Sequence, residues 1–201
     1  ALNDVSFVVK TGTVTGLVGP SGSGKTTAAT LIPRFFDVQK GSVRVGGVDV
    51  RQMNSHDLMS QVAFVFQDTK LFKTSVLENI RMARPDASRE EVLAAARTAR
   101  CDDILEKLPD GLDTVVGTKG VYLSGGEAQR IALARAILKD APIIVLDEAS
   151  AFADPENEAL IQKAFAQLTR GKTVLMIAHR LSTIQRADQI LVLEKGEVQE
   201  R

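Results

Sequence analysis

The sequence has almost no cysteine, few aromatic residues and no excess charge of either sign. Its 201 residues contain one cysteine, Cys101, which excludes an internal disulfide and suits a reducing compartment. Lys and Arg number 25, as do Asp and Glu, so the net charge of +0 gives no electrostatic basis for nucleic acid as the main partner. No stretch approaches the roughly 18 unbroken apolar residues of a membrane-spanning helix. The 44% hydrophobic and 25% charged residues are an ordinary globular composition, and the length suits one domain with a sizeable core.

Four short apolar runs rich in β-branched residues predict the strands of a sheet. Each run is nearly continuous, which is typical of parallel strands covered on both faces. Helical patterns separate the runs, so we expect an α/β fold. The predicted strands are VTGLV (14–18), VAFVF (62–66), IIVL (143–146) and TVLMIA (173–178), and the predicted helices cover residues 25–33, 88–99, 125–139 and 156–169.

Other parts of the chain interrupt this parallel pattern. Residues 3–9 and 42–50 alternate between apolar and polar and predict an antiparallel β subdomain. LVLEKGEVQE (191–200) has the pattern of a hairpin. Residues 74–139 are mostly helical, and we expect a small helical subdomain inserted between the strands there.

A polar candidate follows each of the four predicted strands. The first run leads into a glycine-rich loop with Lys25, the second into Gln67, the third into Asp147 and Glu148, and the fourth into His179. In open α/β sheets, ligands bind at the carboxyl ends of the strands. The sequence therefore predicts one cleft that collects these side chains.

The glycine-rich loop GPSGSGKT (19–26) predicts a P-loop that binds phosphate. Its glycines let the backbone curl tightly, so that loop N–H groups and the N-terminus of the following helix point at phosphate oxygens. Lys25 would bring positive charge to the β- and γ-phosphates, and the Thr26 hydroxyl would ligate Mg²⁺. A glycine-rich turn that merely starts a helix is the alternative, but chance gives the full pattern in only about one chain per hundred of this length. The predicted phosphate-binding residues are Gly19, Pro20, Ser21, Gly22, Ser23, Gly24, Lys25 and Thr26.

Asp147 closes an apolar strand, so its carboxylate can reach a Mg²⁺ ion held by Thr26 and the phosphates. A bare Asp-Glu pair also occurs as a helix cap at strand–loop junctions. The metal-binding interpretation therefore depends on the P-loop upstream.

The stretch LSGGEAQR (123–130) predicts the start of a helix with an unusual first turn. Ser124 and Glu127 have the spacing of a capping box. Capping does not explain Gly125 and Gly126, because each glycine costs about 1 kcal/mol of helix stability against alanine. Both glycines make sense if a ligand approaches the backbone closely.

Together and in this order, the P-loop, LSGGEAQR and IIVLDE (143–148) resemble the nucleotide-binding domain of an ATP-binding cassette (ABC) transporter, over essentially the whole chain. The resemblance implies a P-loop NTPase (RecA-like) core with ATP and Mg²⁺ as cofactors. It also implies that two such domains, in a homo- or heterodimer, close head to tail around two ATP molecules. The γ-phosphate held by one P-loop would then contact the other subunit's Ser124, Gly125, Gly126 and Glu127.

The same resemblance implies further roles for single residues. Glu148 would orient or deprotonate the attacking water, and His179 would contact the γ-phosphate. Gln67 would contact Mg²⁺ or water and join the helical subdomain, and Thr27 would touch the α-phosphate. The expected catalytic residues are Glu148, His179 and Gln67, and the expected metal ligands are Thr26, Gln67 and Asp147.

The sequence departs from the family pattern at several positions. Glu127 stands where glutamine is usual, and we hypothesise that its negative charge weakens the closed ATP dimer. Ala151 replaces a serine three residues before Asp154 in the loop that crosses the dimer interface, and Thr118 replaces a glutamate. Only Phe7 is aromatic ahead of the P-loop, so we expect the residue that stacks on adenine to lie upstream of this chain.

The resemblance implies ATP hydrolysis that powers transport through attached transmembrane domains, at the cytoplasmic face of a membrane. LFKTSVLENI (71–80) resembles exporter-type members, and LSGGE with AFADPE (151–156) resembles siderophore transporters of that plan. We expect residues 1–201 to be one nucleotide-binding domain cut at both ends from a polypeptide that also carries the transmembrane domains. A soluble ABC ATPase acting in translation or on DNA is the alternative, although only 56 positions separate Gln67 from Leu123 (123 − 67), too few for long coiled-coil arms.

Overall fold

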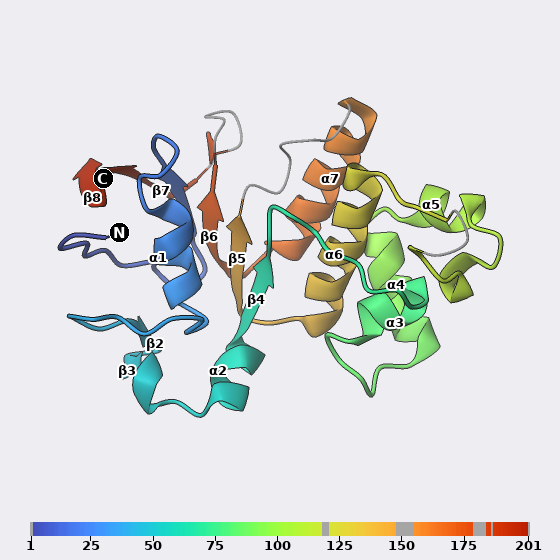
Figure 1. Ribbon diagram of the computed structural model, residues 1–201, viewed down its shortest axis with the longest axis horizontal. Coiled ribbons are helices and arrows are strands. Elements are labelled where there is room, and N and C mark those ends of the chain that lie inside the picture. Colours follow the sequence, from blue (N-terminus) through green and yellow to red (C-terminus); the bar gives the residue numbers. More distant parts are fainter. Residues whose placement is uncertain (1, 118–120, 148–154, 179–183, 186, 201) are drawn as a thin grey trace. The chain divides into compact units, whose positions relative to one another are not determined.

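The computed structural model describes residues 2–117, 121–147, 155–178, 184–185 and 187–200 (Figure 1). The chain divides into two compact units. The first consists of Ala1–Phe64, Ala141–Glu148 and Gly171–Arg201, and the second of Val65–Asp140 and Ala149–Arg170. None of the described helices combines the length and apolar character that a membrane span requires. The expected helical stretch 74–139 falls inside the second unit, and its standing as a separate subdomain stays a prediction.

A six-stranded sheet forms the centre of the first unit. Its strands are β1 (Val14–Val18), β4 (Val62–Val65), β5 (Ile143–Asp147), β6 (Thr173–Ile177), β7 (Gln189–Glu194) and β8 (Glu197–Glu200). The strand order is β4-β5-β6-β1-β7-β8. β1 pairs in parallel with β6 and β7, and β5 pairs in parallel with β6, whereas β7 and β8 form an antiparallel hairpin. The predicted mainly parallel sheet with an antiparallel part is confirmed.

The register brings the carboxyl ends of the central strands to the same level. Leu17 of β1 lies opposite Ile177 of β6, and Ile177 lies opposite Asp147 of β5. The loop that follows β1 therefore leaves the sheet at the edge where β5 ends with Asp147. The P-loop and Asp147 thus share one edge of the sheet, and the cleft that also collects Gln67, Glu148 and His179 stays a prediction.

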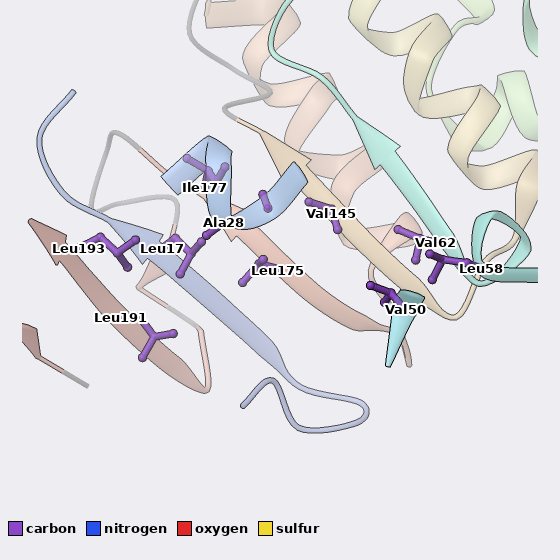
Figure 2. Packing of buried hydrophobic residues seen from close by; sticks show 11 residues of the cluster. Leu17, Ala28, Val50, Leu58, Val62, Val145, Leu175, Ile177, Leu191 and Leu193 are labelled. Carbon is purple, nitrogen blue, oxygen red and sulfur yellow. The ribbon is translucent and has the colours of Figure 1, made fainter. Parts of the chain in front are cut away.

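The core of the first unit lies between the sheet and the helices that cover it. α1 (Lys25–Leu31) packs on β5 and β6. Figure 2 shows Leu17, Val145, Leu175 and Leu191, from four different strands, with Ala28 of α1 in the same apolar cluster. The helix ends two residues earlier than the predicted 25–33, because Pro33 cannot continue the helical hydrogen bonding.

The predicted antiparallel β subdomain forms only in part. β2 (Arg44–Val45) and β3 (Val48–Asp49) pair around Gly46 and Gly47, as expected. The prediction of a strand over residues 3–9 is wrong. Asp4 has a φ of +48°, which breaks an extended strand, although the alternation is real because Phe7 and Val9 pack against the core. A 3₁₀ turn, η1 (Val50–Gln52), and a helix that the sequence pattern does not predict, α2 (Ser55–Gln61), follow β3.

The second unit is helical. Its elements are α3 (Val76–Arg81), α4 (Arg89–Thr98), α5 (Asp102–Lys107), η2 (Gly111–Asp113), α6 (Gly125–Lys139) and α7 (Pro155–Leu168). α6 is the central helix and packs against α3, α4 and α7 (Figure 1). Serine N-caps start α3, α4 and α6, since each hydroxyl accepts a hydrogen bond from a backbone N–H of the first turn. α6 has the predicted bounds, whereas α4 and α7 differ from prediction by one residue at each end.

Candidate functional site

The glycine-rich loop after β1 has, at three positions, a backbone conformation that residues other than glycine rarely adopt. Gly19, Gly22 and Gly24 have φ values of +145°, +76° and +103°. A Cβ at Gly19 would lie 1.9 Å from the carbonyl oxygen of Leu193 in β7, whereas a Cβ at Gly22 would meet nothing within 4 Å. The first glycine is therefore required by packing inside the protein. Gly22 leaves open space on the outside of the loop.

The hairpin of β7 and β8 supports this loop. The Gly196 N–H donates to the carbonyl oxygen of Ser23 at 3.0 Å, and Gly19 rests against the carbonyl of Leu193. The support fixes the curve of the loop without a ligand. Sequence reasoning missed it, because nothing in the hairpin pattern indicates which other segment it contacts.

Lys25 is buried, with 5% of its surface exposed, at the first position of α1. Its ammonium group donates to the carbonyl oxygens of Gly19 and Pro20, both at 2.9 Å, and lies 3.4 Å from the Ser23 hydroxyl. These three acceptors are neutral. The first turn of α1 contains no acidic residue, so the positive end of the helix adds to the charge of Lys25. The loop is thus suited to an anion such as a phosphate group.

Thr26 and Asp147 meet beside the loop. The Thr26 hydroxyl lies 3.4 Å from Oδ1 of Asp147, which is 6% exposed at the end of β5. A hydroxyl and a carboxylate oxygen side by side are hard ligands of the kind that Mg²⁺ takes together with phosphate oxygens. Two of the three predicted metal ligands, Thr26 and Asp147, therefore come together from distant segments and fit the ion.

The first turn of α6 carries the predicted capping box. The Glu127 N–H donates to the Ser124 hydroxyl at 3.2 Å, and the Ser124 N–H donates to Oε2 of Glu127 at 2.8 Å. A Cβ at Gly126 would lie 2.9 Å from Cβ and Cγ of Asn157 in α7, while a Cβ at Gly125 would meet nothing within 4 Å. The prediction that a ligand approaches both glycines stays a prediction, and the structure adds a second reason for one of them. Packing against α7 requires a small residue at Gly126 in any case, whereas Gly125 has open space where a side chain would lie.

An arginine that the sequence analysis did not select anchors the same helix. Arg130 is 1% exposed, and its guanidinium makes a two-pronged contact with the Asp103 carboxylate at 2.5 and 2.9 Å and also donates to the carbonyl of Arg100. This contact lowers the pKa of Asp103 below its ordinary value. An arginine on the apolar face of the predicted helix could have indicated a buried ion pair. The sequence does not show which carboxylate is its partner.

Of the other predicted site residues, some are exposed on the surface and some lie outside the described part of the chain. Gln67 comes two residues after the end of β4, belongs to the second unit and is exposed. In the first unit, Ser21 in the loop and Thr27 in α1 are exposed as well. Glu148, His179, Asp154, Ala151 and Thr118 lie outside the described residues.

Comparison with known proteins agrees with this arrangement. A profile of the ABC transporter family matches residues 2–151. The chain is 55% identical over 200 residues to the mycobactin import ATP-binding/permease protein IrtA of Mycobacterium tuberculosis, covering 100% of this chain and 23% of the relative. It is 50% identical over 200 residues to an ATP-dependent lipid A-core flippase of Legionella pneumophila, covering 100% of this chain and 34% of that protein.

A solved structure of a bacterial Atm1-family ABC exporter with ATP bound superposes with a TM-score of 0.91 at 42% identity, covering 99% of this chain and 35% of the exporter chain. The chain belongs to the ABC transporter family. Within that family it is a nucleotide-binding ATPase domain of the exporter-type architecture, and it spans about a quarter to a third of the length of these relatives. The resemblance drawn from the three sequence motifs is confirmed.

Proposed function

We propose that this domain hydrolyses ATP in a head-to-tail dimer and that hydrolysis powers transport of a substrate across a membrane. The observation that carries the proposal is the meeting of Thr26 and Asp147 beside a preformed glycine loop. The loop offers backbone and ammonium donors to phosphate oxygens, and the two oxygen ligands offer a place for the accompanying cation.

In this proposal, Lys25 and the loop backbone hold the β- and γ-phosphates, and Thr27 contacts the α-phosphate. Mg²⁺ would be held by Thr26, Asp147 and Gln67, and when bound it neutralises charge on the phosphates. The N-terminus of α6 of the opposite protomer closes on the γ-phosphate, with its open backbone at Gly125. The residues of this turn that make the contact are Ser124, Gly125, Gly126 and Glu127.

Glu148 and His179 act on the reacting atoms in this proposal. The Glu148 carboxylate orients the attacking water and takes its proton, and His179 donates to the γ-phosphate. Residues 74–139 form the helical subdomain that Gln67 joins to the core. The family membership supports these assignments, which follow from the matching motif positions.

The proposed partners are a second nucleotide-binding domain and transmembrane domains on the same polypeptide. The names of two relatives describe an ATP-binding/permease protein and a flippase. This chain covers 23% and 34% of their lengths, so both relatives have room for further domains. The domain would lie at the cytoplasmic face of the membrane, where ATP is available. The two names assign different cargoes at 55% and 50% identity, so similarity of this domain does not select the cargo.

The test separates binding from hydrolysis in the full-length protein. Glu148→Gln should lower ATP hydrolysis by about two orders of magnitude or more, because the general base is lost, yet leave an ATP-dependent dimer intact. Lys25→Ala should abolish both properties. Normal hydrolysis by the Glu148→Gln protein, or a dimer that forms equally well without ATP, would refute the proposal.

A further inference from the structure

The carboxylate of Glu127 has a cationic neighbour on another helix. Lys107 is the last residue of α5, and its ammonium nitrogen lies 3.8 Å from Oε1 of Glu127. The side chain of Lys107 is 69% exposed, whereas that of Glu127 is 17% exposed. The cation therefore stays in water while it faces a carboxylate that is largely covered.

Glu127 cannot turn away from the first turn of α6 without losing the helix cap. Its second carboxylate oxygen, Oε2, accepts the Ser124 N–H at 2.8 Å, and its own N–H donates to the Ser124 hydroxyl. The negative charge is consequently fixed in the turn that contains the open backbone of Gly125. An anion that approaches Gly125 meets this charge, which works against the positive end of the helix.

Lys107 also belongs to a row of alternating charges along α5 and α6. Asp103 lies one turn before Lys107 on α5 and holds the buried Arg130 of α6. Lys107 contributes, after Arg130, to the lowered pKa of Asp103. The charges of Arg130, Asp103, Lys107 and Glu127 alternate in sign, and together these four charges sum to zero. Since Arg130 is paired with Asp103, Lys107 is the cation that offsets Glu127 in the first turn of α6.

We propose that Lys107 is a positioning residue for nucleotide: by compensating Glu127, it allows the first turn of α6 to accept the triphosphate of ATP. The inference rests on the proposed function of that turn. It also modifies the hypothesis that Glu127 weakens the closed dimer. The Glu127 carboxylate should weaken ATP-dependent closure mainly when Lys107 is absent. An ion pair at 3.8 Å whose lysine is 69% exposed contributes little to folding, so we expect Lys107→Ala to change ATP-dependent closure and not stability.

A double-mutant cycle in the full-length protein tests the proposal. The four proteins are the parent, Lys107→Ala, Glu127→Gln and the double variant, each with Glu148→Gln to prevent turnover. The measurement is the ATP concentration that gives half-maximal dimer closure, read by cross-linking or fluorescence at low and at high salt. Lys107→Ala should raise this concentration about twofold to fivefold at low salt when Glu127 is present, and not measurably in the Glu127→Gln background.

Two controls separate an electrostatic role from a structural one. Lys107→Arg should restore closure, and the effect of Lys107→Ala should shrink at about 1 M salt, where the screening length is roughly 3 Å. Lys163→Ala, at an exposed lysine of α7, should leave closure unchanged. The thermal unfolding midpoint of Lys107→Ala should stay at that of the parent.

An equal rise in both backgrounds, or no rise in either, would overturn the inference while leaving ATP-dependent closure of the parent intact. Failure of the parent itself to close with ATP would overturn the proposed function and this inference together. The two failures are therefore distinguishable in one experiment.

Discussion

The two proposed phosphate-binding segments, the loop after β1 and the first turn of α6, both depend on glycine but for different reasons. In the loop, Gly19, Gly22 and Gly24 all have positive φ, so the backbone path itself requires them. In α6, neither Gly125 nor Gly126 has positive φ, and the turn is held by side chains instead. The loop after β1 is thus shaped by backbone conformation, whereas the first turn of α6 is shaped by capping, packing and charge. Substitutions should therefore fail in different ways in the two places.

The largest effect is expected at Gly19, where backbone strain and a clash coincide. Gly19→Ala should destabilise the protein by about 3 kcal/mol or more, because the new Cβ would lie 1.9 Å from the Leu193 carbonyl oxygen. Gly22→Ala is the matched control, since it has positive φ but open space, and should cost about 1–2 kcal/mol. Chemical unfolding of both variants measures the difference. Equal stabilities would show that packing against β7 does not shape the loop.

The next effect concerns the side-chain anchor of α6. Asp103→Ala leaves the buried guanidinium of Arg130 without its carboxylate partner. Because the Asp103 side chain is 42% exposed and partly screened by water, the loss should be about 1–3 kcal/mol. The Arg130→Met, Asp103→Ala double variant removes both charges and should recover much of that loss. If the double variant is as unstable as Asp103→Ala alone, the ion pair is not what holds the helix.

The same pair predicts a pH dependence. Because Arg130 lowers the pKa of Asp103 in the folded protein, the carboxylate stabilises the fold above its unfolded pKa of about 3.9. This contribution is lost as the pH falls through the lower folded pKa. Between about pH 5 and pH 2, the free energy of unfolding should thus fall less steeply with falling pH for Asp103→Asn than for the parent. Parallel curves would mean that Asp103 does not titrate differently on folding.

The smallest effect separates the two glycines of α6. Gly126→Ala should destabilise by about 1–2 kcal/mol because Asn157 must move, whereas Gly125→Ala should leave stability unchanged or raise it by up to about 1 kcal/mol. Only Gly125→Ala should combine full stability with weakened ATP-dependent closure. Intact closure in that variant would indicate that no ligand approaches the backbone there.

Local patterns predicted most of the elements in this fold. The apolar run 14–18 and the capping box at Ser124 gave β1 and α6 with their observed bounds, because strand burial and helix capping are decided by neighbouring residues. Residues 3–9 show the limit of this reasoning. Their alternation correctly identified Phe7 and Val9 as inward-facing, but it could not reveal that Asp4 leaves the extended conformation.

The candidate site was predictable where a motif carries its own chemistry. The P-loop and the aspartate at the end of β5 were identified from sequence, and the structure brings Thr26 and Asp147 together. The reason for Gly126, the partner of Arg130 and the cation beside Glu127 could not be predicted. Each depends on which residue of a distant helix comes into contact, and spacing along the chain does not contain that information.

The contact between the last hairpin and the glycine loop has a practical consequence. The Gly196 N–H donates to the carbonyl oxygen of Ser23, and the Leu193 carbonyl packs against Gly19. The hairpin therefore supports the glycine loop directly, although it lies at the edge of the sheet. A shorter fragment that ends before Gln189 would lack the hairpin and would lose this support of the loop. A probe attached near Lys195 would, conversely, report on the loop without altering any residue that we propose to contact phosphate.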